Sequence, residues 1–192
     1  LSSSSAASDV YKRQGEAQRT YEWRSDTLTN YHALLYVVEG KYRDVAEEKD
    51  VTIALEIADD LPPVRADREY LSAAIECLLD NALKFSKEPG LTVTLQAYRE
   101  GNHVCISVID QGRGIPEEEL QHIFEAFYQI DRDQYEDQGA GSGLAIVDGV
   151  VRLHSGHMSV ESTFGKGSTF TIHLPLQRRD TNNVSGEAPA AP

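Results

Sequence analysis

The stretch GAGSGLAIVDGVVRLHSG, from Gly139 to Gly156, places three glycines at alternate positions ahead of an apolar periodic run and ends on another glycine. The apolar spacing predicts a helix from Gly143 to His154, which Gly156 ends. Glycines that open a helix leave backbone N–H groups bare at its positive end, where an anion can approach closely. The stretch therefore predicts a phosphate-binding loop that leads into a helix, and the alternative is a flexible turn without a ligand.

The two common phosphate-loop patterns do not match this stretch. No Lys-Ser or Lys-Thr pair follows the glycines, as a P-loop requires, and Leu144 stands where a dinucleotide fingerprint has its last glycine. The polar segment IDRDQYEDQGAGS, from Ile130 to Ser142, has no hydrophobic periodicity and is long for a loop inside a compact domain. We expect this segment to be a lid.

Periodicity on both sides of the glycine stretch predicts further helices and strands. In chain order they are a helix at about 20–49, a strand at 51–57, a helix between Asp67 and Pro89, a hairpin at 91–110 with its turn at Gly101, a short helix within 115–129, and a final hairpin around Gly165–Gly167. The apolar face of the first helix is expected to contain Leu28, Tyr31, Leu35, Val38, Tyr42 and Val45. This order predicts an α+β fold, a two-layer α/β sandwich in which helices cover one face of a mixed β-sheet, preceded by an N-terminal helix.

The 192-residue chain is acidic, with a formal net charge of -13. Its field repels polyanions, which argues against nucleic acid as a partner and requires any phosphate ligand to be held by local groups. Cys77 and Cys105 have neither disulfide nor metal-knuckle spacing, which predicts reduced thiols in a cytoplasmic protein. His154 and His157 have no matching Cys or carboxylate cluster, which disfavours zinc binding by that pair.

The two ends of the chain lack the periodicity of the middle. The chain begins at Leu1 and its only methionine is Met158, so we expect a fragment of a longer protein. Residues 1–14 are Ser-rich and lack the apolar centre of a signal peptide, which indicates a non-native or disordered leader. Residues 177–192 are expected to be a disordered tail.

The stretch DQGRGI, from Asp110 to Ile115, follows a predicted buried strand. A carboxylate at that point can accept a hydrogen bond from an exocyclic amine, and glycines allow a flat ring to lie against the backbone. An Asp beside glycines is also a common turn former.

The stretch LLDNALKFS adds Asn81 and Lys84, one turn apart on the strongest predicted helix. Asn81 could ligate Mg²⁺, a hard cation that prefers oxygen ligands and shares them with phosphates, or could simply face solvent.

In this order the three stretches resemble the ATP-binding catalytic domain of sensor histidine kinases, within the GHKL or HATPase_c superfamily of Bergerat-fold proteins. The resemblance covers residues from about Asp50 to Leu176. LLDNALKF resembles the N box, DQGRGI the G1 box, IFEAFYQ the F box, GAGSGLAIV the G2 box, and GKGSTF the closing glycine motif. The ordered set of five motifs is highly specific.

The resemblance implies that Asn81 ligates Mg²⁺, that Asp110 accepts from the adenine amine, and that Lys84 approaches phosphate. It also implies that 131–142 is an ATP lid, at whose entry Phe124 and Phe127 pack. The full set of expected ATP-binding residues is Asn81, Lys84, Asp110, Gly112, Gly114, Ile115, Phe127, Gly139, Gly141, Ser142, Gly143, Leu144 and Thr169.

Some positions depart from the family pattern. Cys77 stands where many histidine kinases carry asparagine, and Ala126 and Gln129 stand at positions that are often arginine. Arg132 is a candidate substitute for the missing arginine contacts to the γ-phosphate. Ser142 replaces a usual leucine and is expected to cap the following helix.

The resemblance implies a protein-histidine kinase fragment that donates the ATP γ-phosphoryl to a histidine on a missing upstream hairpin. Residues 15–49 resemble the second helix of that dimerisation and phosphotransfer hairpin, and 50–176 the ATP-binding domain. His32 lacks the acidic neighbour of a phosphoacceptor, so we expect no catalytic residue and no autophosphorylation within the fragment. The implied partners are a response-regulator receiver domain and, in the full-length parent, a second copy in a homodimer; membrane anchoring of the parent is left open.

Two alternatives to kinase activity remain open from the sequence. One is a nucleotide-responsive regulatory module with weak or no activity, as the departures from the family pattern would allow. The other is an ATP-hydrolysing GHKL relative, which would carry a general-base glutamate one turn before Asn81. Cys77 occupies that position and Glu76 lies one residue away, which disfavours hydrolysis.

Overall fold

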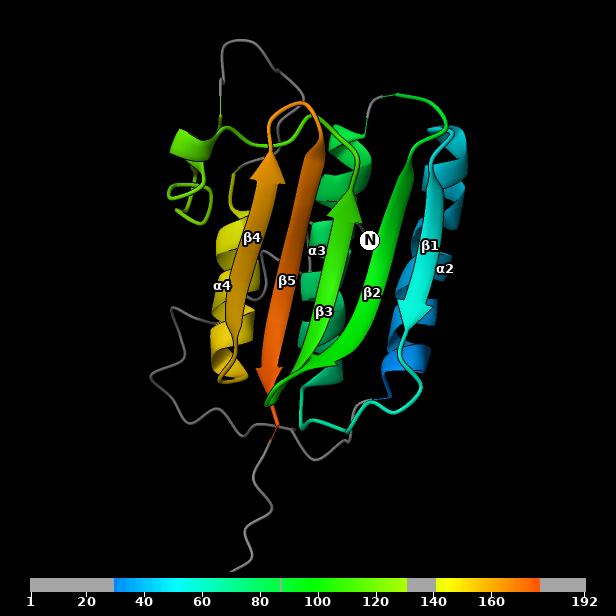
Figure 1. Ribbon diagram of the computed structural model, residues 1–192, viewed down its shortest axis with the longest axis vertical. Helices are drawn as coiled ribbons and strands as arrows, with labels where there is room; N and C mark the ends of the chain where they lie inside the picture. Colours follow the sequence, from blue (N-terminus) through cyan, green and yellow to red (C-terminus); the bar gives the residue numbers. More distant parts are fainter. Residues whose placement is uncertain (1–29, 87, 131–140, 177–192) are drawn as a thin grey trace, which may run out of the picture.

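The computed structural model describes residues 30–86, 88–130 and 141–176, which form two layers (Figure 1). One layer is a five-stranded sheet in the order β1-β2-β3-β5-β4. The strands are β1 (Thr52–Ile57), β2 (Thr92–Glu100), β3 (His103–Asp110), β4 (His157–Thr163) and β5 (Gly167–Pro175). The other layer contains α2 (Tyr31–Glu48), α3 (Arg68–Phe85) and α4 (Gly143–Leu153). The predicted α+β sandwich is confirmed.

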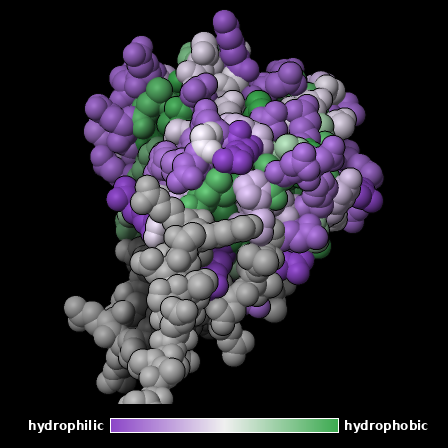
Figure 2. All heavy atoms as spheres, turned by 60° about the horizontal axis from the view of Figure 1, so that its bottom comes forward, coloured by the Kyte–Doolittle hydropathy of each residue, from purple (hydrophilic) through white to green (hydrophobic). Residues whose placement is uncertain are grey.

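The surface at the lower end of the molecule is mostly hydrophilic, with smaller apolar areas between polar side chains (Figure 2). Among the helices that the structure describes, none combines the length and the apolar character needed to cross a membrane.

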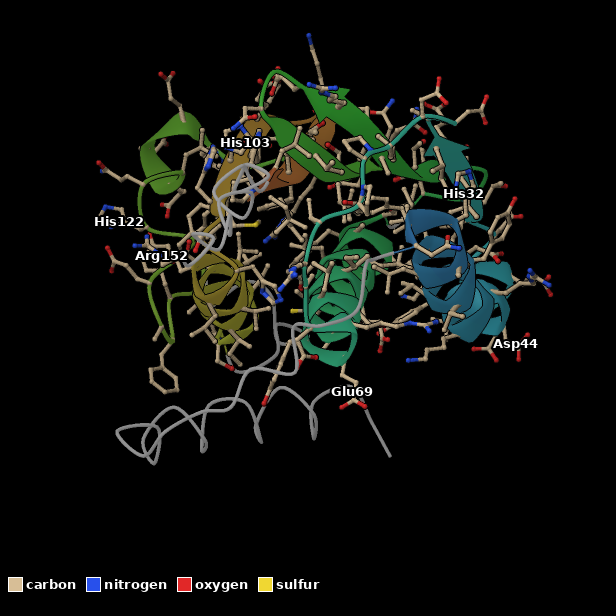
Figure 3. The ribbon with its side chains drawn as sticks, turned by 90° about the horizontal axis from the view of Figure 1, so that it is seen from below. His32, Asp44, Glu69, His103, His122 and Arg152 are labelled. Carbon is tan, nitrogen blue, oxygen red and sulfur yellow. The ribbon has the colours of Figure 1, made fainter. Side chains whose placement is uncertain are left out.

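The sheet is mixed, as predicted. β1 and β2 run parallel, and the other three pairs of neighbouring strands are antiparallel. A parallel pair needs a crossover connection, which α3 supplies between β1 and β2. Figure 3, seen from below, shows the three helices side by side on one face of the sheet. The other face carries no helix within the described ranges. It is the outer face of the sheet.

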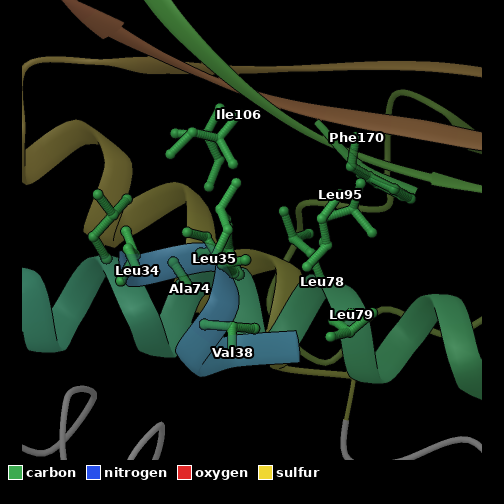
Figure 4. Packing of buried hydrophobic residues seen from close by; sticks show 14 of the residues in the cluster. Leu34, Leu35, Val38, Ala74, Leu78, Leu79, Leu95, Ile106 and Phe170 are labelled. Carbon is green, nitrogen blue, oxygen red and sulfur yellow. The ribbon is translucent and has the colours of Figure 1, made fainter. Parts of the chain in front are cut away.

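Helix α3 lies in the centre of the helical layer, as its sequence dictates. Asp67 caps it by accepting hydrogen bonds from the N–H groups of Glu69 and Tyr70 at 3.0 and 3.2 Å. Its apolar stripe is buried against the sheet and the neighbouring helices; the buried residues are Leu71, Ala74, Ile75, Leu78, Leu79, Ala82 and Leu83. Figure 4 shows part of this stripe facing Leu95, Ile106 and Phe170 of the sheet.

Helix α2 belongs to the same hydrophobic core. Asn30 caps it, accepting from the N–H of Ala33 at 3.0 Å, and Leu34, Leu35 and Val38 are almost completely buried beside α3 (Figure 4). The expected apolar face is wrong at Val45, which is 38% exposed, because Ala46 occupies the inward position. The predicted domain boundary between residues 49 and 50 thus separates a helix and a sheet that share one core. Residues 20–29 of the predicted helix lie outside the described residues.

The short helix expected within 115–129 is reduced to a single 3₁₀ turn at Glu117–Glu119, followed by irregular turns. Phe127 has a φ of 69°, a left-handed conformation that a right-handed helix cannot contain. An isolated helical turn also forms too few backbone hydrogen bonds to stabilise a longer helix by itself.

Packing of α2 into this core predicts that Leu35→Ala destabilises the whole sandwich by about 2–5 kcal/mol, because it leaves a cavity beneath a fully buried side chain. The matched control is Val37→Ala on the same helix, where the side chain is 45% exposed and the cost should stay below about 1 kcal/mol. Urea unfolding followed by circular dichroism measures both. Equal midpoints for Leu35→Ala and the wild type would show that α2 is not part of the domain.

Candidate functional site

The candidate site lies where β3 ends and β5 begins, at the upper end of the sheet in Figure 1. Asp110, the last residue of β3, is opposite Ser168 of β5. The segment after Asp110 runs past the last residue of α3, since the carbonyl oxygen of Phe85 would lie 2.6 Å from a β-carbon added at Gly112. The residues of the predicted G1 box, N box and closing glycine motif therefore meet at one place.

Asp110 presents a buried carboxylate that has one oxygen occupied and one available. Oδ1 accepts from the N–H groups of Gly112 at 2.8 Å and Ser168 at 3.3 Å. No donor in the described residues reaches Oδ2, and no described cation pairs with the carboxylate. Burial raises the pKa of Asp110 above its usual value of 3.8, while the two backbone hydrogen bonds lower it. A carboxylate that is 8% exposed and has no counter-ion costs stability, which is typical of a group kept for binding.

Two glycines allow the backbone to close tightly around Asp110. Gly167 has a φ of 124°, and a β-carbon there would overlap the carbonyl oxygen of Asp110. Gly114 has a φ of 68°, and a β-carbon there would overlap the carbonyl oxygen of Thr163. Larger residues would push these segments apart, so the glycines bring the G1 segment and the β4–β5 turn into contact.

Helix α3 places Asn81 on the side that faces α4. Cys77, one turn earlier, has its Sγ 2.9 Å from the position of a β-carbon at Gly143, the first residue of α4. Residues four apart lie on the same helix face, so Asn81 also points toward the start of α4. Asn81 is half-buried and its side-chain amide makes no hydrogen bond to the described residues. Its oxygen is thus available to a ligand or a metal ion.

Two cations lie beside Phe85 at the end of α3. The Nζ atom of Lys84 is 5.9 Å from the ring centroid of Phe85, and the guanidinium carbon of Arg113 is 4.7 Å from it. The family resemblance implied Lys84 as a phosphate contact, but Arg113 was not predicted, because the two glycines on either side of it were assigned to the adenine base. Both side chains supply positive charge locally in an acidic protein.

The start of the glycine loop contacts the F-box segment. The carbonyl oxygen of Gly141 accepts from the N–H of Phe127 at 3.0 Å. Phe127 is 67% exposed, whereas Phe124 packs against the core. Gly139 and Arg132, with most of the predicted lid, lie outside the described residues.

Three other predicted residues, Ser142, Gly143 and Leu144, lie at the start of α4. Gly143 begins the helix and Leu144 packs partly against the core, as does Ile115, whose N–H donates to Ser162 Oγ at 2.8 Å. Ser142 occupies the N-cap position, but its side chain makes no capping hydrogen bond. The expectation that it caps α4 is wrong, because its backbone is in the αR region rather than the extended conformation that aims a capping oxygen at the helix.

The structure places Thr169 away from this site. It pairs with Ile109 and Glu161 in the sheet, so it points to the outer face, because side chains alternate along a strand. Its neighbour Ser168 is buried and lies beside Asp110. Ser168 therefore replaces Thr169 among the candidate residues, and the two-residue period of the strand is the signal that identifies it.

Glu76 is engaged on the opposite side of α3. It accepts from Lys41 of α2 at 2.5 Å and from Ser72 at 2.8 Å. It is held toward α2, whereas Cys77 and Asn81 face α4. Glu76 is therefore turned away from the α4 side on which Asn81 lies and is not placed to act as a general base there, which does not favour an ATP-hydrolysing relative.

Residues 66–178 match the family described as "Histidine kinase-, DNA gyrase B-, and HSP90-like ATPase", HATPase_c. The chain belongs to this family. The matched range contains Asn81, Asp110 and the glycines around them, in the order that the sequence predicted.

Similar proteins include named sensor kinases. The chain is 38% identical over 138 residues to the adaptive-response sensory kinase SasA of Rippkaea orientalis, covering 72% of this chain and 35% of that one. It is 42% identical over 133 residues to the circadian input-output histidine kinase CikA of Synechococcus elongatus, covering 68% and 17%. The chain thus spans about a third or less of these relatives.

A solved structure of full-length ShkA in complex with AMPPNP is 32% identical, with a TM-score of 0.69, and covers 78% of this chain and 30% of that one. The nucleotide-free catalytic domain of histidine kinase ThkA shares the fold with a TM-score of 0.67 at 22% identity, covering 78% of this chain and 94% of that one. The HATPase_c fold therefore extends over most of the described chain, including residues before position 66.

The close contact at Gly114 predicts that Gly114→Ala is more harmful than an equivalent change in open space. Gly101→Ala is the matched control, since Gly101 has a φ of 54° and nothing within 4 Å of its would-be β-carbon. The control should lose about 1–2 kcal/mol through the left-handed backbone alone, and Gly114→Ala should lose at least about 1 kcal/mol more through overlap with backbone. Urea unfolding midpoints compare them, and equal losses would contradict the close approach.

Proposed function

We propose that this chain binds Mg-ATP at the end of β3 and serves as the ATP-binding catalytic domain of a sensor histidine kinase. The observation that carries the proposal is the buried Asp110 carboxylate, which has one oxygen held by two backbone N–H groups and the other open. Family membership and the similarity to ShkA, whose structure contains AMPPNP, support an adenine nucleotide as the ligand.

Asp110 provides selectivity for adenine. Its open oxygen accepts a hydrogen bond from the exocyclic amine of adenine. Guanine presents a carbonyl oxygen at the equivalent ring position, so two acceptors would face each other in a buried place. An unpaired buried acceptor is costly, and the site therefore discriminates against GTP.

The phosphates are assigned to the side of the site between α3 and α4. Lys84 and Arg113 carry positive charge at the end of α3. The N-terminus of α4, which begins at Gly143 shortly after Gly141, presents backbone N–H groups. These groups offset the repulsion that the net charge of -13 exerts on a polyanion.

Asn81 fits the role of a Mg²⁺ ligand. Its side-chain amide is half-buried, has no hydrogen-bonding partner in the described residues, and faces the start of α4. A bound Mg²⁺ would neutralise charge on the phosphates, and one protein oxygen suffices because Mg²⁺ keeps several waters. Asn81 would position that ion, while the lysine and arginine nearby hold the phosphate oxygens.

The phosphoryl acceptor is assigned to a histidine outside this chain, on an upstream dimerisation hairpin of a homodimeric parent. His32 is an unsuitable acceptor, since it lies on α2, which packs against β1 at the opposite edge of the sheet from β4 and α4 (Figure 3). The product phosphohistidine would then serve a response-regulator receiver domain. The proposed kinase function implies both partners, the upstream hairpin and the receiver domain, and a cytoplasmic location.

Asp110→Asn should weaken ATP binding at least about tenfold without loss of stability at pH 7. The amide keeps an oxygen for the N–H groups of Gly112 and Ser168, but it turns a donor toward the adenine amine. Burial raises the pKa of Asp110, so the wild type loses stability relative to the variant as the pH rises through that pKa. This pH-dependent part of the difference is absent well below pH 3.8, where the carboxyl is protonated in both the folded and the unfolded state.

Calorimetric titration with Mg-ATP measures the affinity, and thermal unfolding between pH 3 and 8 measures the stability. Asp59→Asn is the matched control, since this exposed residue lies in the turn after β1. Unchanged ATP affinity in Asp110→Asn would remove the carboxylate from the binding site.

Phosphotransfer should require both the upstream hairpin and Asn81. Incubation with γ-labelled ATP should leave the chain alone unlabelled and should label the hairpin, when supplied, as acid-labile and base-stable phosphohistidine. Asn81→Ala should reduce labelling at least about tenfold through lost Mg²⁺ positioning, whereas Asn102→Ala, in the exposed turn after β2, should not. Labelling of the chain alone that disappears in His32→Gln would show that the acceptor is misplaced.

A further inference from the structure

A second group of chemically reactive side chains lies at the opposite end of the sheet from Asp110. It consists of Glu100 at the end of β2, His103 and Cys105 on β3, His157 on β4 and His173 on β5. Cys105 pairs directly with His173, which pairs in turn with His157. Side-chain alternation puts this row on the outer face, because the neighbours Val104, Ile106 and Ile172 point into the core. Figure 3 shows His103 on the side of the sheet away from the helices.

Three members of this group converge. Cys105 Sγ is 3.3 Å from His173 Nδ1 and 3.9 Å from Glu100 Oε2, and the last two atoms are 3.9 Å apart. A zinc ion bound tetrahedrally, at about 2.3 Å from sulfur and 2.0–2.2 Å from nitrogen or oxygen, separates such ligand atoms by roughly 3.3–3.7 Å. The observed triangle therefore needs only small side-chain adjustments to surround a metal ion.

The imidazole of His173 is already oriented for ligation through Nδ1. Its Nε2 lies 2.8 Å from Ser159 Oγ, and its ring stacks on His157 with centroids 4.3 Å apart and planes 3° from parallel. His103 meets both rings edge-on, at 5.4 Å from His157 and 6.2 Å from His173. A hydrogen bond to the second nitrogen and packing on both sides are the features that orient histidine ligands in metal sites.

The donor set selects the kind of ion. Thiolate with imidazole and carboxylate suits Zn²⁺ and its neighbours among the divalent transition metals, whereas Mg²⁺ prefers oxygen ligands alone. The three donors are carried by three adjacent strands that pair antiparallel, which holds their backbones at fixed spacing. Glu100 is exposed, so an ion can enter from solvent, while Cys105 is fully buried behind it.

We propose that Glu100, Cys105 and His173 form a binding site for one Zn²⁺-class divalent transition-metal ion on the outer face of the sheet, with water in the fourth position. On binding, the Cys105 sulfur forms a bond to the metal and its proton passes to solvent. The ion then links β2, β3 and β5 and stabilises the folded chain. Cys105 is five residues from Asp110 along β3, about 17 Å at the strand rise, so this site is separate from the proposed nucleotide site.

A titration of the reduced, metal-free protein with Co²⁺ in the absence of nucleotide tests the proposal. Cobalt substitutes for zinc, and a cobalt–thiolate bond gives a charge-transfer absorption in the near ultraviolet that neither imidazole nor carboxylate ligation produces. The wild type should develop this band to a 1:1 end point, and added Zn²⁺ should abolish it by displacement. Cys105→Ser should lose the band, and His173→Gln should weaken Co²⁺ binding at least tenfold.

Cys77→Ser is the matched control, since Cys77 and Cys105 are the only cysteines of the chain, and this variant should keep the band. Circular dichroism of each metal-free variant confirms folding, and His173→Gln provides an independent test if Cys105→Ser does not fold. Absence of the band in the folded wild type at millimolar Co²⁺, or its persistence in Cys105→Ser, would overturn the proposal. Neither result bears on ATP binding, which is measured separately.

Discussion

Burial of the apolar stripe of α3 against the sheet is the constraint on which the rest of the structure depends. This helix supplies the crossover between the parallel strands β1 and β2 and packs against both α2 and α4. Its inward face is entirely apolar, so its remaining faces are free for other uses. The α4 side carries Cys77 and Asn81, and the last turn ends in Lys84 and Phe85. The position of the candidate site thus follows from how the core is packed.

At Asp110 the proposed binding role and the stability of the fold oppose each other. The end of β3 closes onto β5 through a buried carboxylate, although an uncharged side chain with the same acceptor oxygen would close it at lower cost. Burial raises the pKa of Asp110, which means that ionisation is unfavourable in the folded chain. The charge therefore makes physical sense as part of a binding site whose ligand donates to the open oxygen.

Much of this arrangement was predictable from local sequence patterns. The stripe of α3, the two antiparallel hairpins and the glycine stretch before α4 each have a periodicity or turn signal that acts within about 20 residues. Three predictions failed where local geometry decided the outcome. Val45 is exposed because the helix phase favours Ala46, Ser142 does not cap because of its backbone angles, and the short helix within 115–129 is reduced to one 3₁₀ turn at Glu117–Glu119.

The cluster on the outer face could not have been found in the sequence. Cys105 and His173 are 68 residues apart, and only the register of β3 with β5 brings them together. The sequence disfavours a zinc site at His154 and His157, and the structure shows why this pair is unsuitable. His154 is buried on the helical side, where its Nε2 accepts from the N–H of Asp67 and its Nδ1 donates to the carbonyl oxygen of Val150. His157 instead stacks on His173 on the outer face.

Asp110 and the glycine-lined end of the sheet are proposed to form an adenine-selective site for a magnesium nucleotide. Calorimetric titrations of the chain with ATP and with GTP, each with and without Mg²⁺, test this claim most directly. Binding of ATP should strengthen with Mg²⁺, and binding of GTP should be at least about tenfold weaker, because guanine turns an acceptor toward Asp110. No heat with millimolar Mg-ATP, or equal affinities for ATP and GTP, would contradict this claim.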